Sequence, residues 1–128
     1  MSEMSNFLEN ALINATLRAT TYTSVATVYV SLWTSDPTDA GSGTEVSGGS
    51  YARTAVTFAA PSNGVTTNSA DVTFPTAPAS WGVVGWIGIN DAASSGKLLY
   101  HSPLDTSKTI DSGDIFKIST GNLSVTLA

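Results

Sequence analysis

The residues with the greatest potential for chemistry are one histidine and two pairs of closely spaced carboxylates. His101, the single histidine of the sequence, would need an orienting carboxylate and a nucleophile within reach to act as a general base. The sequence does not show either group within reach, and a lone histidine on a strand is usually structural, so we interpret His101 as a structural residue. The pairs Asp36/Asp39 and Asp111/Asp114 flank proline or glycine turns, where aspartate stabilises the turn by bonding to nearby backbone.

An alternative interpretation of the first acidic loop is a weak calcium site formed by Asp36, Asp39 and Glu45, because calcium prefers loop oxygens. Their spacing matches no EF-hand or repeat loop. The chain also lacks phosphate-binding, dinucleotide-binding and serine-nucleophile motifs, and it contains no cysteine. We therefore predict no catalytic residue, no metal site and no cofactor, and we expect that the protein is not an enzyme.

The three tryptophans could serve a different chemistry, since aromatic rings stack on sugars and anchor protein–protein contacts. Trp33 and Trp86 lie on predicted strands, so we expect them to be buried in the sheet or at a subunit boundary. Trp81 follows a loop rich in proline and alanine, which makes it the better candidate for an exposed or interfacial ring. A carbohydrate-binding module would need an exposed row of such rings, and the sequence does not provide one.

Composition limits the class of protein more strongly than these motifs. The chain has 128 residues, 41% hydrophobic and 12% charged, which suits one folded domain and excludes a disordered chain. A formal net charge of −5 excludes the basic surface that nucleic-acid binding requires. No apolar run reaches about 18 residues, and the N-terminus lacks the basic start of a secretory signal, so we expect no membrane partner.

The segment from Ser5 to about Thr20 is the predicted helix. Asn6 followed by Glu9 is similar to a capping box, which is typical of a helix start. One face of this helix collects five apolar side chains, namely Phe7, Leu8, Ala11, Leu12 and Ala15. Ile13 and Leu17 lie on the opposite side. The pattern indicates either a wide apolar stripe on an overlying arm, or a helix held between its own domain and a partner chain.

From residue 21 onward, apolar and polar residues alternate with a period of two, which predicts strands. Residues 28–33 form a predicted half-buried strand that ends before the turn residues Asp36 and Pro37. The pair Asn63-Gly64 predicts a tight hairpin turn. Residues 82–90 are apolar on both faces, so they form either a central strand or one face of a subunit contact. Their glycines predict a bulge or a close backbone approach.

These segments give seven to nine predicted strands, with frequent turn signals and no second helix. The predicted fold class is therefore mainly β: an antiparallel β-sandwich, jelly-roll-like, with one N-terminal α-helix. Residues 1–20 form the predicted N-terminal arm and helix, and residues 21–128 form the predicted β-sandwich domain. Without disulfides, such a fold depends on packing, hydrogen bonds and association for its stability.

Several sequence blocks resemble a known family. The most specific one runs from Gly43 to Arg53 and reads GTEVSGGSYAR, and it is accompanied by LENAL at residues 8–12 and VYVSLWT at residues 28–34. Over nearly its whole length the chain resembles small virion structural proteins of tailed bacteriophages, which include head decoration proteins and tail-fibre-like proteins. The resemblance implies a virion structural protein, made in the cytoplasm of the bacterial host.

Within that family we expect a capsid decoration (cement) protein on the outer surface of the phage capsid, which clamps neighbouring capsid subunits and stabilises the head. A compact single domain favours this role, because fibres usually carry extended repetitive shafts. The alternative is a tail or tail-fibre component involved in host receptor binding. The expected partners are the major capsid protein and further copies of the chain, most simply as a homotrimer that buries the second face of the helix or of residues 82–90.

Periodicity and loop position select seven candidate residues for the subunit or capsid interface. Three of them lie in or beside the glycine-rich block, where a docking or inter-subunit loop would pair Arg53 with a carboxylate; the alternative is an ordinary loop at a strand edge. The complete set is Ile13, Leu17, Glu45, Tyr51, Arg53, Trp81 and Trp86.

Overall fold

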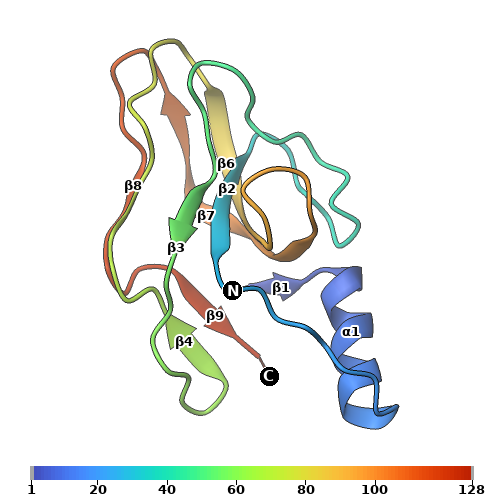
Figure 1. The fold of residues 1–128 in the computed structure, drawn as a ribbon. Helices are drawn as coiled ribbons and strands as arrows, with labels where there is room; N and C mark the ends of the chain where they lie inside the picture. The colour runs from blue at the N-terminus through green and yellow to red at the C-terminus, as the bar shows by residue number, and fades with distance from the viewer. Residues whose placement is uncertain (1, 128) are drawn as a thin grey trace.

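A five-stranded antiparallel sheet organises the chain, with one helix at its side (Figure 1). The structure is a computed structural model and describes residues 2–127. Along the sheet, the strands follow the order β1 (Glu3–Met4), β7 (Leu98–Ile110), β6 (Gly82–Asn90), β2 (Val28–Trp33) and β3 (Thr54–Val56). Each neighbouring pair is antiparallel, as expected for strands joined by turns and loops rather than by crossover helices.

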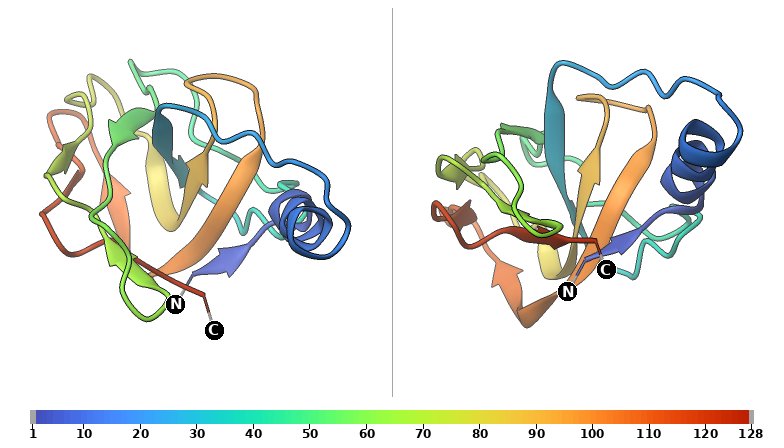
Figure 2. Two further views of the ribbon diagram at one scale, coloured as in Figure 1. Left: turned by 60° about the horizontal axis from the view of Figure 1, so that its bottom comes forward. Right: turned by 90° about the horizontal axis from the view of Figure 1, so that it is seen from below.

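The second layer consists of two short ribbons. In one ribbon β4 (Val65–Thr67) pairs with β9 (Ser124–Thr126), and in the other β5 (Val72–Thr73) pairs with β8 (Lys117–Ile118). Figure 2 shows these ribbons on one side of the large sheet and the helix on the other. The predicted mainly β, antiparallel and sandwich-like fold with an N-terminal helix is therefore confirmed, although its second layer is not one continuous sheet.

The hydrophobic core lies between the large sheet and the two ribbons. It takes the inward-facing side chains of the sheet and the aromatic rings opposite them, and its most buried members include Val30, Leu32, Val72, Phe74 and Val84. The Phe74 ring packs edge-on against that of Phe116, at 5.6 Å between centroids. Aromatic pairs in this geometry stabilise a core beyond the area that they bury.

β2 is buried on both faces, so the prediction of a half-buried strand is wrong. Ser31 and Trp33 face away from the core, yet both are buried. Trp33 Nε1 donates to Ser31 Oγ (2.8 Å), and Ser31 Oγ donates to Asn90 Oδ1 (2.6 Å), so these polar atoms keep their hydrogen bonds without water. Trp33 lines a pocket together with residues from the start of the helix, the loop at 39–41 and the turn at 95–97.

β6 lies between β2 and β7, which confirms the prediction of a central strand. Its pairing with β7 shifts register between Val84 and Trp86, so a bulge falls at Gly85. At Gly88 the neighbouring side chains come unusually close: an added Cβ would lie 2.7 Å from Ser31 Oγ and 2.9 Å from Trp33 Nε1. The bulge and the close approach, which the glycines predict as alternatives, therefore both occur in this strand.

The turn at Asn63-Gly64 forms as predicted. Both residues have positive φ angles, 53° and 76°, which is the conformation of a type I′ turn. Ser62 and Val65 on either side exchange backbone hydrogen bonds of 3.0 Å. This local signal is strong because glycine and asparagine tolerate the left-handed region better than other residues do.

The helix α1 spans Asn6–Leu17 and begins one residue earlier than the predicted capping box. Ser5 is the N-cap, because its extended backbone brings Oγ to the N–H of Leu8, from which it accepts a hydrogen bond of 3.2 Å. The same hydroxyl donates to the carbonyl oxygen of Leu98, so the cap also ties the helix to β7. No helix within residues 2–127 is long and apolar enough to cross a membrane.

Candidate assembly surface and histidine cluster

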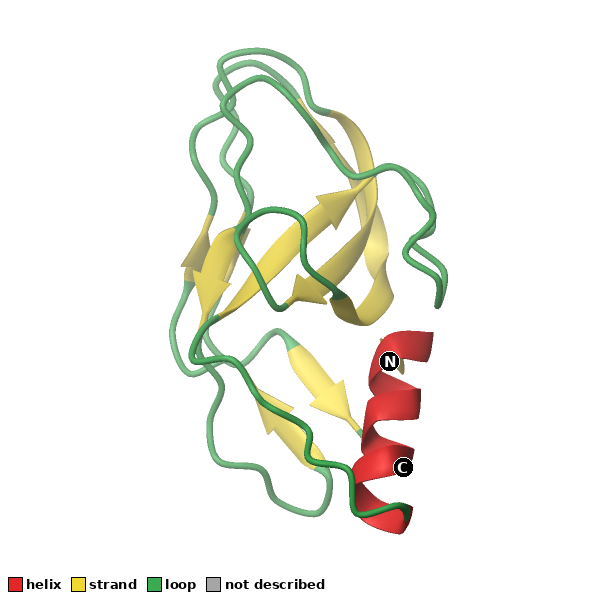
Figure 3. Cartoon of the chain, turned by 45° about the vertical axis from the view of Figure 1, so that its right-hand side comes forward, coloured by secondary structure: helices red, strands yellow, loops and turns green. Residues whose placement is uncertain are grey.

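The helix leaves three of its apolar side chains, Phe7, Ile13 and Leu17, exposed to solvent. Leu8 is its one buried residue, and the remaining members of the predicted apolar face are only partly covered or exposed. Ile13 is 52% exposed and Leu17 is 79% exposed. Figure 3 shows α1 standing beside the strands, with a long loop leading from its end back to β2. Ile13 and Leu17 are therefore accessible to a partner, and their place in an interface stays a prediction.

Glu45, Tyr51 and Arg53 converge within their own chain. Arg53 donates from Nε to Glu45 Oε2 (2.9 Å) and from Nη2 to Glu45 Oε1 (2.8 Å), while the Tyr51 hydroxyl donates to Oε2 (2.6 Å). Arg53 Nη1 also donates to the carbonyl oxygens of Ala92 and Ser95, at 3.0 and 2.8 Å. The carboxylate that pairs with Arg53 thus comes from the same loop, and the group fastens this loop to the turn after β6.

The electrostatics of this group follow from its burial and its hydrogen bonds. Burial raises the pKa of Tyr51, and its hydrogen bond to Glu45 raises it further. The hydrogen bond to Glu45 likewise raises the pKa of Arg53. The polar atoms of this group bond to one another, so these side chains stabilise the loop that would carry any docking contact.

Trp81 lies in the core, so the prediction of an exposed or interfacial ring is wrong. Only 5% of its surface is exposed. Its Nε1 donates to the carbonyl oxygen of Gly49 (2.8 Å), and its ring meets the Tyr51 ring edge-on at 5.5 Å. The glycine-rich loop folds over the ring, and an added Cβ at Gly49 would lie 2.9 Å from Nε1. Trp86 is half-buried and pairs across the strands with Trp33.

The three carboxylates of the candidate calcium site turn to three different partners. Asp36 accepts from the N–H of Thr38 (2.9 Å), Glu45 binds Arg53, and Asp39 contacts His101. They do not form one site, because each carboxylate is drawn to its own donor. The turn role of Asp36 is confirmed.

Asp114 confirms the turn role predicted for the second acidic pair. Its Oδ2 accepts from the N–H of Asp111 (2.8 Å), and its own N–H donates to the Asp111 carbonyl oxygen (3.0 Å). Both bonds lie within the turn, so this pair needs no metal to explain it.

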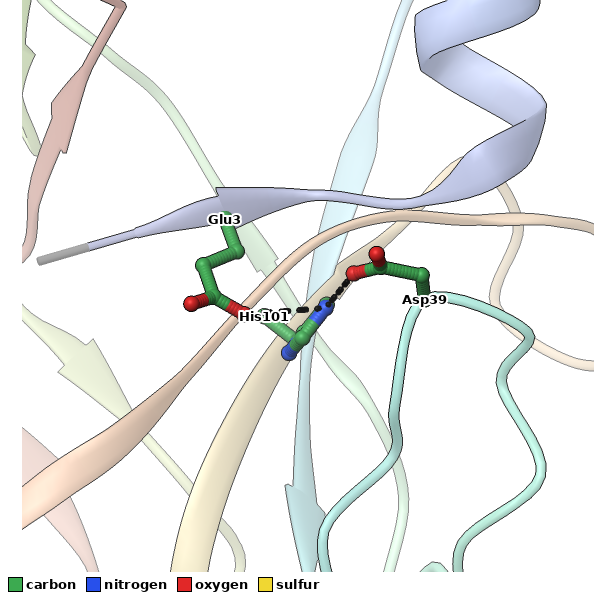
Figure 4. Close-up of side chains that lie close together, drawn as sticks. All are labelled: Glu3, Asp39 and His101. Atoms are coloured by element: carbon green, nitrogen blue, oxygen red, sulfur yellow. Dashed lines mark hydrogen bonds and ion pairs between the residues drawn. The ribbon is translucent and has the colours of Figure 1, made fainter.

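His101 contacts two carboxylates from distant parts of the chain. Its Nε2 lies 2.8 Å from Asp39 Oδ1 and 3.8 Å from Glu3 Oε2, and Figure 4 shows the imidazole between the two carboxylates. The sequence predicts a structural role for His101 but does not identify Glu3 or Asp39 as its partners. The available signal was indirect: a histidine buried on a strand needs hydrogen-bond partners for its ring nitrogens.

Comparison with known proteins gives one family. The family model of the podophage GP4 fiber I protein gp80 matches residues 3–126, from the first residue of β1 to the last residue of β9. No curated protein matches the chain. The match bears out the resemblance to virion structural proteins of tailed phages and extends over the whole fold described above. The chain therefore belongs to the podophage GP4 fiber I protein gp80 family of virion structural proteins.

Proposed function

We propose that the protein is a non-enzymatic structural subunit of a phage fibre, working through contacts with copies of itself and with neighbouring virion proteins. The observation that carries this proposal is the match to a fibre protein family across residues 3–126. The match favours a fibre role over a capsid decoration role, because the matching family is described by a fibre protein. The capsid decoration role would share the virion location but would require the major capsid protein as its partner.

The geometry supports a structural subunit, because the domain is internally well packed and hydrogen-bonded. The large sheet is covered on both faces around Ser31 and Trp33, and the polar atoms buried there bond to each other. Arg53 and Glu45 fasten the longest loop to the body. A domain whose buried polar atoms all find hydrogen-bond partners within the chain is rigid, so it keeps its shape when neighbouring subunits bind to it.

The surface of α1 supports association with other copies. A helix docked mainly through Leu8 leaves Ile13 and Leu17 in water, where they gain stability only by meeting another apolar surface. We propose a homo-oligomer, most simply a trimer, in which this surface of α1 is covered by a second copy. Association of this kind would bury further apolar surface and would need no catalytic activity.

Labelled virions test the proposed location. Phage carrying an epitope in the exposed turn around Gly113 would be imaged with a bound antibody fragment. Phage in which the gene is deleted, and the same deletion with the gene supplied in trans, would be imaged beside it. We expect label on a fibre, loss of that fibre density in the deletion, and reduced adsorption to the host. Label distributed over the head lattice, with fibres intact in the deletion, would contradict the fibre role and support the capsid decoration role.

A further inference from the structure

Glu3, Asp39 and His101 bring three metal-ligating atoms together from three separate parts of the fold. Glu3 lies on β1, Asp39 in the loop after β2, and His101 on β7 (Figure 4). Within residues 2–127, they are the one group of three such side chains whose ligand atoms all lie within 4.8 Å of one another. The arrangement offers one imidazole nitrogen and two carboxylate oxygens to a common point.

The backbone holds all three residues in place. Glu3 and His101 are direct partners in the antiparallel pairing of β1 with β7, which sets their side chains side by side. The carbonyl oxygen of Asp39 accepts from the N–H of Asn6 (2.9 Å), and the N–H of Ser5 donates to the carbonyl oxygen of Leu99 (2.8 Å). The side chains therefore need only small rotations to bind one metal ion together.

Burial differs sharply within the group. The His101 side chain is 4% exposed, whereas those of Glu3 and Asp39 are 61% and 46% exposed. The buried imidazole is thus fixed in place, whereas the two carboxylates are open to solvent and can adjust their positions. An ion could enter from this side and keep water at any remaining coordination position.

Two carboxylates face a single nitrogen atom, and one proton on Nε2 satisfies only one of them. Asp39 Oδ1 is at hydrogen-bond distance, whereas Glu3 Oε2 at 3.8 Å is beyond it. A divalent cation would instead contact all three atoms and balance both negative charges. Zinc binds nitrogen and oxygen at about 2.0–2.2 Å, which places tetrahedral ligand atoms about 3.3 Å apart. The two distances measured from Nε2 bracket that separation.

We propose that Glu3, Asp39 and His101 form a binding site for a divalent transition metal of the zinc type. The mixed nitrogen and oxygen donor set favours such a metal over magnesium and calcium, because these hard cations prefer oxygen ligands alone. His101 Nε2 and one oxygen from each carboxylate hold the ion. Bound metal joins β1, β7 and the loop after β2, so it secures the arm that carries α1 to the sheet. The site does not depend on the proposed fibre role.

The test uses the full chain without a polyhistidine tag, freed of metal with a chelator and titrated with zinc chloride. His101 is the single histidine of the sequence, so its ring nitrogen resonances in a long-range proton–nitrogen NMR spectrum report on this site alone. We expect one zinc ion per chain by calorimetry, a large change in the Nε2 resonance, and a melting temperature that rises with zinc concentration. Magnesium and calcium chloride at equal concentration should leave all three readouts unchanged.

Variants of Glu3 and Asp39 distinguish a specific zinc site from general attraction of zinc to the negative charge of the chain. Glu3→Gln and Asp39→Asn each remove one ligand and should weaken zinc binding by about 10-fold or more, since even indirect partners of metal sites have effects of that size. Asp105→Asn, on the exposed part of β7, removes the same charge and should bind zinc like the parent. Glu3→Gln serves if Asp39→Asn does not fold, because the Glu3 side chain is largely in solvent.

The proposal fails if the Nε2 resonance stays in place at saturating zinc. It fails equally if Glu3→Gln and Asp39→Asn bind zinc as tightly as the parent, or if Asp105→Asn weakens binding to the same extent as they do. In the last case zinc would be responding to the net charge of the chain rather than to the three residues.

Discussion

Arg53 and Glu45 form a two-point ion pair, in which Nε lies 2.9 Å from Oε2 and Nη2 lies 2.8 Å from Oε1. The planar guanidinium matches the carboxylate with both bonds at once, which lysine could not do. Its third nitrogen reaches the backbone of the turn after β6. One residue therefore connects the glycine-rich loop to the end of the central strand.

Replacing Glu45 by Gln should lower the free energy of unfolding by about 2 kcal/mol, because hydrogen bonds to charged groups contribute roughly this amount and Arg53 would be left largely buried without its counter-ion. Urea unfolding followed by circular dichroism measures the change. Asp105→Asn on the exposed part of β7 is the control and should stay within about 0.5 kcal/mol of the parent. Equal stability of the two variants would show that the ion pair does not hold the loop.

Gly88→Ala should destabilise the protein by about 1–3 kcal/mol, the usual cost of adding a methyl group to a closely packed interior. The new Cβ would lie 2.8 Å from Leu98 Cδ1 and 2.7 Å from Ser31 Oγ, so the neighbouring side chains would have to move. Gly85→Ala in the same strand is the matched control, because its Cβ would meet Ser107 Cβ at an ordinary 4.0 Å. Thermal unfolding of both variants checks the prediction, and a larger loss at Gly85 would contradict it.

The variant with Ile13→Ser and Leu17→Ser together should keep its fold and lose association. Both side chains are exposed on α1, so each change should alter the monomer's stability by no more than about 0.5 kcal/mol. Analytical ultracentrifugation should show the parent as an oligomer and the variant shifted towards monomer. Leu8→Ala is the contrasting change: it removes the buried contact of the helix and should cost about 2–5 kcal/mol. A parent that is monomeric at tens of micromolar would contradict association through this surface.

Asp71 should make the ribbon of β5 and β8 sensitive to acid. The backbone N–H of Thr120, then its hydroxyl and then Lys117 hold the pKa of this carboxylate below its ordinary value of 3.8. Because the folded-state pKa is lowered, the carboxylate stabilises the fold above that ordinary value, and the contribution is lost as the pH falls through the folded pKa.

Asp71→Asn should therefore melt below the parent at pH 7, and the gap between the two should shrink as the pH falls below about 4. Melting curves recorded between neutral and strongly acidic pH check this, with Asp105→Asn as a second exposed carboxylate for comparison. A gap that widens in acid would contradict the sign of the pKa shift.

Short-range chemistry made much of the fold predictable. Asn63-Gly64 specifies a tight turn within two residues, and the acidic turn at Asp111 and Asp114 closes on itself. The alternation in residues 28–33 and the double apolar pattern of residues 82–90 identify strands for the same reason, because each pattern depends only on neighbours along the chain. The capping box at Asn6 predicts the helix start one residue too late, since Ser5 caps the helix through a hydroxyl that also bonds across to β7.

Composition and local patterns are enough to predict a charge-poor, mainly β chain with one N-terminal helix, and the specific sequence blocks indicate a phage virion protein. Two contacts are visible only in the folded chain: the loop at Gly49 covers Trp81, and His101 meets Asp39, 62 residues away along the chain. The physical reason is that contacts of this kind depend on the strand order and on the path of long loops. Many strand orders satisfy the same pattern of alternating residues, and packing of the whole chain selects one of them.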